Sequence, residues 1–292
     1  MNCIDQVVTD RYAAYHGDCV EVLKGLPDAS VGYSIFSPPF ASLYTYSNSP
    51  RDMGNVRDDA EFFAHFDFLI AELRRVMRPG RNVSFHCMDM PSSKERDGVI
   101  GLKDFPGDLL RAFQRHGFIF HAKVTIWKDP VTAMQRTKAL GLLHKSVREN
   151  SAMCRMGIPD YLITVRAPGE QDGRVTHGAE FPVDLWQKVA SPVWMDINPS
   201  DTLQFRSARE HDDERHICPL QLEVIRRGVM LWTNPDDIVL SPFMGIGSEG
   251  YVALEMGRRF VGAELKASYY SQAVANLAAA MKQSQGLFAE VP

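Results

Sequence analysis

The first part of the chain alternates short apolar runs with amphipathic stretches. Residues 33–36 form an apolar run that predicts a strand, and Pro38 and Pro39 stop it because proline cannot continue a ladder. Over residues 60–77, apolar side chains recur at helical spacing, at Phe62, Phe66, Leu69, Ile70, Leu73 and Met77. The Arg-Pro-Gly tripeptide at 78–80 is expected to end this helix. Three further elements are predicted: a strand over 82–87, a helix near 105–116 and a strand over 118–127.

The C-terminal part of the chain repeats this alternation of helix and strand. Its predicted elements are a helix over 219–232, a strand over 237–240, a helix over 248–256, a strand over 259–264 and a helix from about 268 to 282. Strands that alternate with helices are typical of a parallel, doubly wound sheet. We therefore expect an α/β fold.

The middle of the chain, residues 128–215, shows few clear periods, and its first part is basic. Over 128–155, six cations stand against the two acids Asp129 and Glu149; the cations are Lys128, Arg136, Lys138, Lys145, Arg148 and Arg155. Such a patch is typical either of a solvated helical face or of a surface that follows a phosphate backbone. Both interpretations stay open at this point.

Composition narrows the class of protein. The chain has 292 residues, of which 45% are hydrophobic and 23% charged, as in an ordinary soluble enzyme. Its net charge of −4 does not by itself predict a polyanionic partner, so a DNA-binding protein of this kind must gather its cations on one face. No stretch approaches the roughly 18 apolar residues of a membrane span. The N-terminus carries Asp5 and no long apolar region, which is unlike a signal peptide.

The cysteines point to an intracellular setting. They are five in number and scattered, at Cys3, Cys19, Cys87, Cys154 and Cys218, with no CxxC pair and no histidine at ligand spacing. This usage predicts reduced thiols in the cytoplasm and no metal site.

A glycine-rich turn follows the predicted strand at 237–240. Its sequence from position 241 is SPFMGIGSEG, and glycines at Gly245 and Gly247 let the backbone turn tightly and approach a ligand at a helix N-terminus. Glu264 ends the next predicted strand, where a carboxylate can accept hydrogen bonds from both hydroxyls of a ribose. The pattern predicts a nucleoside cofactor, a nicotinamide cofactor included. The structural alternative is a packing turn whose glycines touch only protein.

The tetrapeptide Ser37-Pro38-Pro39-Phe40 indicates the reaction. The exocyclic amine of cytosine or adenine is a poor nucleophile, and two acceptors aimed at its hydrogens would stabilise the charge that develops during methylation. Ser37 can supply a hydroxyl and Pro38 a carbonyl that Pro39 helps to hold, while Phe40 offers a face on which an extruded base can stack. The structural alternative is a rigid strand end with a core phenylalanine.

The chain resembles the beta class of DNA amino-methyltransferases, in which a (D/N/S)PP(Y/F/W) motif precedes an FxGxG motif and the target-recognition region lies between them. The resembling segments are HGDC at 16–19 through SPPF at 37–40, RVMRPG at 75–80, GF at 117–118 through WK at 127–128, HICPLQ at 216–221, FMGIG at 243–247 and VGAEL at 261–265. The resemblance implies that Asp18 lies near the cofactor adenine and Glu264 on its ribose. Phe243, Gly245 and Gly247 would then shape the methionine end of the pocket. Where the family usually has Asp-Pro-Phe, this chain has Ser241, which cannot pair as an anion with the cofactor ammonium.

The resemblance also implies a fold, a cofactor and a partner. The expected fold is a Rossmann-like methyltransferase sandwich, with a mostly parallel twisted sheet assembled from both ends of the chain. Its parts are a catalytic half over 1–127, a target-recognition insertion over 128–215 and a cofactor-binding half over 216–292. The implied cofactor is S-adenosylmethionine, and the implied partner is double-stranded DNA, from which the target base is flipped. Neither a membrane nor a metal is expected, and the activity is of the kind found in restriction-modification.

Several readings of the function stay open. Cytosine N4 is favoured as the methyl acceptor, because Asp or Asn in place of Ser37 is the commoner mark of adenine-N6 enzymes. A glutamine-amide or RNA methyltransferase, a nicotinamide dehydrogenase and a catalytically inactive DNA-binding relative are the alternatives. The sequence does not decide between a monomer and a homodimer, nor whether a restriction enzyme accompanies the protein.

Overall fold

A computed structural model describes residues 2–39, 53, 56, 58–92, 94–137, 143–204 and 219–289. Within these residues, nine strands form one sheet in the order β1-β2-β11-β10-β3-β4-β8-β7-β9. In chain order the strands are β1 (Asp5–Val8), β2 (Tyr12–His16), β3 (Val31–Phe36), β4 (Met77–Cys87), β7 (Ile119–Ile126), β8 (Asp160–Arg166), β9 (Val193–Trp194), β10 (Ile238–Ser241) and β11 (Arg259–Glu264). A separate hairpin joins β5 (Met90–Ser92) to β6 (Gly101–Lys103).

The centre of the sheet is parallel and is built from both ends of the chain. The C-terminal strands β10 and β11 lie between the N-terminal strands β3 and β2, and β2, β11, β10, β3 and β4 all run in the same direction. The strands β1 and β8 pair antiparallel with their neighbours. The predicted α/β class and its assembly from both ends are confirmed.

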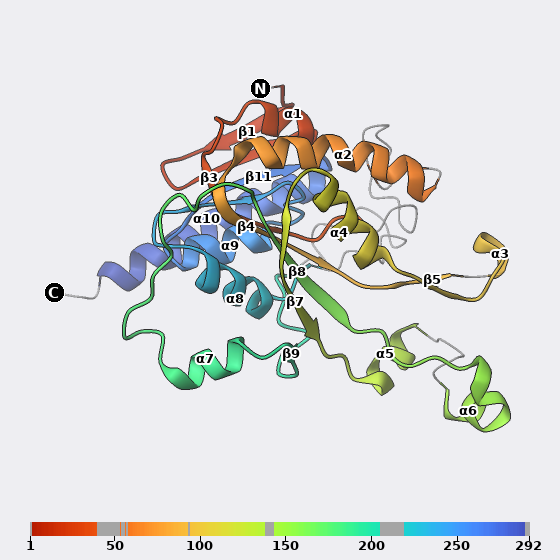
Figure 1. Ribbon diagram of the computed structural model, residues 1–292. Helices are drawn as coiled ribbons and strands as arrows, with labels where there is room; N and C mark the ends of the chain where they lie inside the picture. Colours follow the sequence, from red (N-terminus) through yellow and green to blue (C-terminus); the bar gives the residue numbers. More distant parts are fainter. Residues whose placement is uncertain are drawn as a thin grey trace.

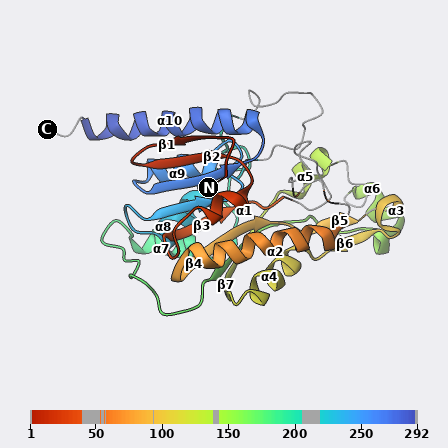
Figure 2. The ribbon, with the colours of Figure 1, turned by 90° about the horizontal axis from the view of Figure 1, so that it is seen from above.

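Helices cover both faces of the sheet, as Figures 1 and 2 show. The helices α1 (Cys19–Lys24), α2 (Asp59–Val76) and α4 (Phe105–Arg115) lie on one face, and α8 (Leu222–Trp232), α9 (Ser248–Glu255) and α10 (Ala267–Ala289) lie on the other. The remaining described helices are α3 (Lys94–Asp97), α5 (Pro130–Thr137), α6 (His144–Asn150), α7 (Val183–Val189) and a 3-10 turn at Ser151–Met153. Among the described residues, no helix combines the length and apolarity needed to cross a membrane.

Each face of the sheet has its own hydrophobic core. On one face, Phe62 and Phe66 of α2 pack with Phe85 and Phe113, and all four are fully buried. On the other face, Tyr33 and Ile35 of β3 belong to the core beneath α8 and α9, as do the apolar residues of those helices. Every residue of β3 is buried, as is typical of a parallel strand covered on both faces. Burial of each large apolar side chain contributes about 1.5–3 kcal/mol, which holds the strand ends beside one another.

The helix predicted over 60–77 is confirmed as α2, and it ends at Val76, just before the tripeptide that was expected to end it. The strand predicted over 82–87 starts earlier than expected, because β4 begins at Met77 and runs through residues 78–80. Gly80 has a φ of +70°, and the ladder from β4 to β8 begins only at Asn82. Gly80 thus supplies a positive φ within β4, and the strand pairs with β8 only after this residue.

The sequence pattern did not predict two further parts of the sheet. The hairpin of β1 and β2 forms one edge, because β2 pairs in parallel with β11. The strands β8 and β9 lie within residues 128–215, where an insertion was expected, and β8 occupies the sheet between β4 and β7. That part of the stretch therefore belongs to the α/β core, and its role in target recognition stays a prediction.

The carboxyl ends of the parallel strands share one side of the molecule. Figure 2 shows that α5, α6 and the hairpin of β5 and β6 project on that same side. Open α/β sheets bind their ligands outside the carboxyl ends of the strands. The candidate site is therefore expected at this edge.

Candidate active site

The glycine turn between β10 and α9 is closed on one side and open on the other. Gly245 and Gly247 have φ values of +54° and +87°. A Cβ atom on Gly247 would lie 3.3 Å from the Ala273 Cα atom in α10, whereas one on Gly245 would meet no atom of the described residues within 4 Å. Gly247 therefore fits a packing turn, while at Gly245 the described residues leave space beside the turn. The open space lies beside the N-terminus of α9, whose first N–H groups have no partners within the helix.

Glu264, the last residue of β11, ties this loop down. Its Oε2 accepts a hydrogen bond of 2.9 Å from the Gly245 N–H, and its Oε1 accepts one of 2.8 Å from the Lys266 N–H. A carboxylate oxygen can accept more than one hydrogen bond, and a ribose hydroxyl is a donor of the kind that it accepts. The geometry fits the predicted ribose contact and adds a role in ordering the loop that the sequence did not reveal.

Asp18 lies at the same edge of the sheet as Glu264. The parallel pairing of β2 with β11 puts His16 opposite Glu264, and the Gly17 N–H donates to the Glu264 carbonyl at 2.9 Å. The Asp18 Oδ1 caps α1 by accepting from the N–H groups of residues 20 and 21, at 2.9 and 3.1 Å. Asp18 thus has a structural function as a helix cap. Its contact with a cofactor adenine stays a prediction.

The first residues of the glycine motif contact the other half of the domain. The Phe243 ring lies 5.7 Å from the Phe36 ring and 6.5 Å from the Phe66 ring, measured between centroids. Ser241 is fully buried, and its hydroxyl has no hydrogen-bond partner among the described residues. A buried hydroxyl without a partner is uncommon, and a polar group bound there would gain a hydrogen bond.

The Ser-Pro-Pro-Phe motif begins where β3 ends, next to the glycine turn. β3 pairs with β10 through Ser34 and Leu240, and Ser37 follows its last residue, Phe36. Ser37 and Pro39 are half-buried and Pro38 is buried, while Phe40 lies outside the described residues. The sheet therefore brings together Ser37 and Phe243, which are far apart in the sequence.

The Ser37 hydroxyl is the first member of a polar chain across four strands. Ser37 Oγ lies 3.2 Å from His86 Nδ1, and His86 Nε2 lies 3.2 Å from Asp160 Oδ2. Lys128 Nζ lies 2.5 Å from the other oxygen, Asp160 Oδ1. Burial opposes the ionisation of Asp160, but His86 and Lys128 outweigh it, so the pKa of this carboxyl lies below its ordinary value.

Sequence reasoning missed His86 and Asp160. His86 lies at the end of the strand predicted over 82–87, where alternation puts it on the same face as Ser84, so a polar residue near a strand end was a signal within reach. Asp160 begins β8, a strand that the sequence pattern did not predict. Nothing in the sequence therefore related Asp160 to Ser37.

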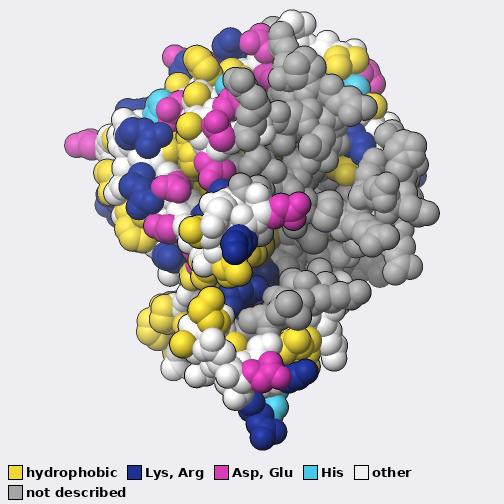
Figure 3. Space-filling view, turned by 90° about the vertical axis from the view of Figure 1, so that its right-hand side faces the viewer, with side chains coloured by type: hydrophobic (Ala, Val, Ile, Leu, Met, Phe, Trp, Pro, Cys, Tyr) yellow, Lys and Arg dark blue, Asp and Glu magenta, His cyan; other side chains and the backbone are white. Residues whose placement is uncertain are grey.

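The predicted DNA-contacting cations occupy different environments. Lys128 is paired with buried Asp160, and the guanidinium of half-buried Arg155 donates to the Met156 carbonyl at 3.2 Å. Lys145 and Arg148 are exposed on α6, and Lys145 lies 3.6 Å from Glu149. Lysine, arginine and histidine side chains gather at the lower tip of the face in Figure 3, where α6 lies. Arg136 belongs to α5, although nothing is described of its side chain, and Lys138 lies outside the described residues.

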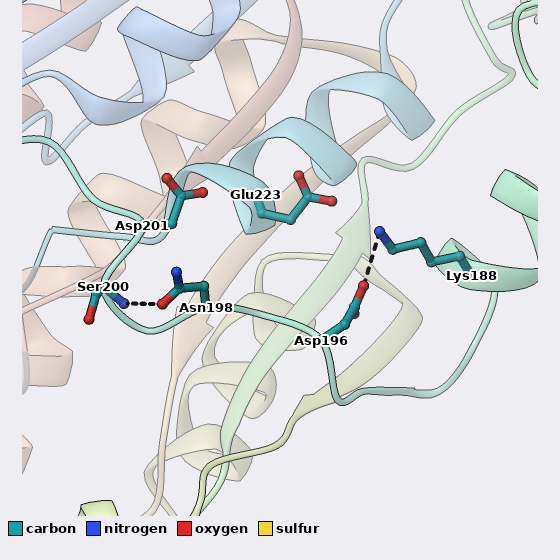
Figure 4. A pocket seen from close by; sticks show the side chains of 6 residues that line it. All are labelled: Lys188, Asp196, Asn198, Ser200, Asp201 and Glu223. Carbon is teal, nitrogen blue, oxygen red and sulfur yellow. Dashed lines mark hydrogen bonds and ion pairs between the residues drawn. The ribbon is translucent and has the colours of Figure 1, made fainter.

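A polar hollow of about 420 Å³ lies beside α7 and α8 (Figure 4). Its lining consists of Lys188, Asp196, Asn198, Ser200, Asp201 and Glu223, none of them a residue singled out from the sequence. Arg227 and Lys188 hold Asp196 by ion pairs of 2.7 and 3.0 Å and lower the pKa of its carboxyl to about 2. Because these charged side chains form ion pairs with one another, we do not take the hollow as the candidate active site, which lies at the carboxyl edge of the sheet.

Comparison with known proteins gives a family-level match. The family model described as DNA methylase, N6_N4_Mtase, matches residues 33–275. The chain is 25% identical over 260 residues to the type II methyltransferase M.BglII of Bacillus subtilis, a match that covers 87% of this chain and 66% of that protein's length. It is also 25% identical over 284 residues to the DNA adenine methyltransferase YhdJ of Escherichia coli (strain K12), covering 94% of this chain and 86% of that protein.

A solved structure shares the fold. The DNA modification methylase TTHA0409 of Thermus thermophilus, solved in complex with S-adenosyl-L-methionine, superimposes with a TM-score of 0.67 and 23% sequence identity. The superposition covers 94% of this chain and 96% of that one. It agrees with the two-sided α/β sandwich seen here.

Proposed function

The chain belongs to the N6/N4 family of DNA methylases, and from this premise we propose that it methylates the exocyclic amine of a base in DNA, with cytosine N4 as its target. The observation that carries the proposal is the position of Ser37. Its hydroxyl lies at the carboxyl end of β3, beside the glycine turn, and contacts His86 at 3.2 Å. A hydroxyl held there can accept a hydrogen bond from an amine.

The cofactor of this family is S-adenosylmethionine, whose sulfonium supplies an electrophilic methyl group when it is bound. The residues present fit such a ligand. Among the described residues the turn is open at Gly245, the Glu264 carboxylate is bonded to the turn through the Gly245 N–H, and the N-terminus of α9 faces the loop. Ser241 offers a hydroxyl rather than a carboxylate, so the ammonium end of the cofactor would be bound without an anion at that position.

Ser37 and Pro38 would prepare the amine for reaction. The lone pair of an exocyclic amine is delocalised into the ring, and acceptors aimed at its two hydrogens favour the pyramidal form. The Ser37 hydroxyl and the Pro38 carbonyl are adjacent in the chain, and Pro39 restricts the backbone between them. Phe40 is proposed to support the base from its face. The transfer would be direct and in line, without a covalent enzyme intermediate.

Double-stranded DNA is the proposed partner, and α6 is a proposed contact with it. The exposed cations Lys145 and Arg148 project on the side where the strands end, which puts them on the same side as Ser37. Phosphate contacts position a duplex without reading its sequence. The bases that are recognised would be read elsewhere in residues 128–215.

The choice of cytosine over adenine rests on Ser37. In the beta class, a neutral serine at this position is more often found in cytosine-N4 enzymes. The alternative is adenine N6, which the similarity to YhdJ, an adenine methyltransferase by name, supports. Both bases present an amine of the same kind, so the mechanism above serves either one.

The test is to identify the product. The protein is incubated with S-adenosylmethionine and DNA of mixed sequence, and the digested DNA is then analysed by mass spectrometry. N4-methylcytosine is expected. N6-methyladenine alone would overturn the choice of base, and the absence of any methylated base would overturn the function.

The role of Ser37 is tested by substitution. Ser37→Ala should reduce turnover while both ligands still bind, because its contribution is made in the transition state. Ser30→Ala is the matched control, since Ser30 lies just before the opposite end of β3, where its hydroxyl donates to the Pro27 carbonyl. Full activity in Ser37→Ala would remove the hydroxyl from the mechanism.

A further inference from the structure

Methylation of an amine releases a proton, and the site contains a path for it. The nitrogen becomes positively charged as it gains the methyl group and must then lose a hydrogen. Ser37 is the proposed contact of that nitrogen, and its hydroxyl leads to His86 at 3.2 Å and onward to Asp160 at 3.2 Å. We infer that His86 is the acceptor of this proton, acting through Ser37 and stabilised by Asp160. This inference rests on the proposed function.

The register of the sheet aligns these groups on one face. Phe36 pairs with Phe85, so Ser37 and His86 are neighbours at the next position of β3 and β4. His86 pairs with Leu162 of β8, and Asp160 lies two residues before Leu162 on the same face. Asp160 pairs in turn with Ile126 of β7, two residues before Lys128. Strand pairing therefore holds His86 and Asp160, and Ser37 and Lys128 lie one and two residues beyond the ends of β3 and β7.

The surroundings of the imidazole select one tautomer. His86 Nε2 is buried and lies 3.2 Å from Asp160 Oδ2, an ion-pair distance, and it makes no hydrogen bond of good geometry with any described residue. A nitrogen that faces a carboxylate carries the hydrogen. Nδ1 is then left with a lone pair, which accepts the hydrogen of the Ser37 hydroxyl. The Ser37 oxygen is thereby turned so that its own lone pairs are available to the amine.

Asp160 is suited to stabilise a transient imidazolium. It is only 4% exposed, and its pKa lies below the ordinary value because His86 and Lys128 outweigh the effect of burial. The carboxylate thus remains an anion while the imidazole gains its charge. Lys128 contributes a permanent cation on the opposite oxygen, and it occupies the first position of the predicted recognition region.

The step balances without a further reactant. The amine nitrogen forms a bond to the methyl carbon, and the carbon–sulfur bond breaks with its electron pair going to sulfur. The nitrogen then gives one hydrogen to Ser37 Oγ as Ser37 gives its own hydrogen to His86 Nδ1. The proton leaves the imidazole for water, which restores the starting state. His86 is a positioning and proton-accepting residue, because it touches the base only through Ser37.

The first experiment replaces His86 by asparagine, whose amide oxygen can still accept from Ser37 but cannot take up a proton. Turnover is expected to fall by roughly 10²- to 10⁴-fold, as for the loss of a general base. The affinities for S-adenosylmethionine and DNA should stay unchanged. Ser84→Ala is the matched control. It removes the buried 2.8 Å contact with Thr164 between β4 and β8, the strands that carry His86 and Asp160, and it leaves Ser37 untouched.

The pH profile separates proton transfer from a merely structural role. The pH profile of turnover should change in His86→Asn, because asparagine offers Ser37 no nitrogen that can take up a proton, whereas a merely structural role would leave the profile as in the wild-type protein. The charged or titratable groups around the imidazole belong to β4, β7, β8 and their ends: Asp160, Lys128, Cys87, Asp89, Lys123 and Tyr161. Of these, only Asp160 contacts the ring directly in the described structure. An unchanged rate and an unchanged profile in His86→Asn would overturn the inference.

The second measurement does not depend on activity. Nitrogen NMR of the histidine ring should find the neutral His86 with its hydrogen on Nε2, and Asp160→Asn should shift it toward a mixture of tautomers. A hydrogen on Nδ1 in the wild-type protein would overturn the inference even if the enzyme is active. If the expected tautomer is found but no DNA is methylated, the proposed function has failed and the proton path falls with it. The two failures are thus distinguishable.

Discussion

Replacing Glu264 by alanine should weaken both the fold and the cofactor site. In the structure this carboxylate accepts two backbone hydrogen bonds, from Gly245 at 2.9 Å and from Lys266 at 2.8 Å. A net hydrogen bond to a charged group contributes about 1.5–3 kcal/mol. Because Glu264 is half-buried, water can solvate part of the two N–H groups that lose their acceptor when the carboxylate is removed. We therefore take the lower end, about 3 kcal/mol for the two bonds together.

This magnitude is large enough to measure in two ways. At about 2–4 °C per kcal/mol for a chain of this size, Glu264→Ala should lower Tm by roughly 6–12 °C. Calorimetry should show S-adenosylmethionine binding weakened by about a hundredfold, because the proposed ribose hydrogen bonds and the order of the glycine turn would be lost together. The Tm and the cofactor affinity of Glu264→Gln should lie between those of the wild-type protein and of Glu264→Ala. The glutamine amide oxygen can accept from only one of the two N–H groups.

The control is Glu255→Ala, which removes a surface ion pair with Arg226 on the adjacent pair of helices. Surface pairs contribute about 0–1 kcal/mol, so its Tm and cofactor affinity should hardly change. If Glu264→Ala matched this control in both measurements, the reasoning from the two backbone bonds would be refuted.

Three further predictions concern stability and DNA binding. Arg81→Ala should cost about 1–3 kcal/mol in chemical denaturation, because Asp237 loses its buried partner and is left with the partly exposed Arg78 at 3.3 Å; no measurable cost would contradict this. Burial raises the pKa of Glu249 to about 8, so stability should be full below pH 4.5 and fall as pH rises toward 8, and Glu249→Gln should abolish the fall in Tm. Lys145→Ala with Arg148→Ala should flatten the salt dependence of DNA affinity by about 0.9 for each phosphate that is no longer neutralised, and an unchanged slope would make α6 a solvated face.

The sequence alone determined the elements that have strong periodicity. The helix predicted over 60–77 is α2, and the strand predicted over 259–264 coincides with β11. These predictions succeeded because a helix that covers a sheet must repeat its apolar positions every three or four residues, and a buried strand must be nearly all apolar. The strand β8 was missed because the segment around it, residues 128–215, shows few clear periods, so its apolar run did not stand out.

The two motifs were readable for a chemical reason. A proline pair after a short apolar strand and glycines before a helix have local causes in backbone geometry, so Ser37 and Gly245 could be singled out without a structure. Their family resemblance then supplied the cofactor and the reaction class, and the family match confirms that class.

What only the tertiary structure decided is which distant groups meet. Ser37, His86, Asp160 and Lys128 come from four separate strands or from the residues just after them, and the register of those strands aligns them. A shift of one residue in any of these pairings would turn a side chain to the opposite face of the sheet. Register depends on the packing of both faces at once, which no local pattern contains. The sequence therefore singled out the serine that we propose faces the base, and the folded sheet brought it beside the histidine that we propose takes the proton.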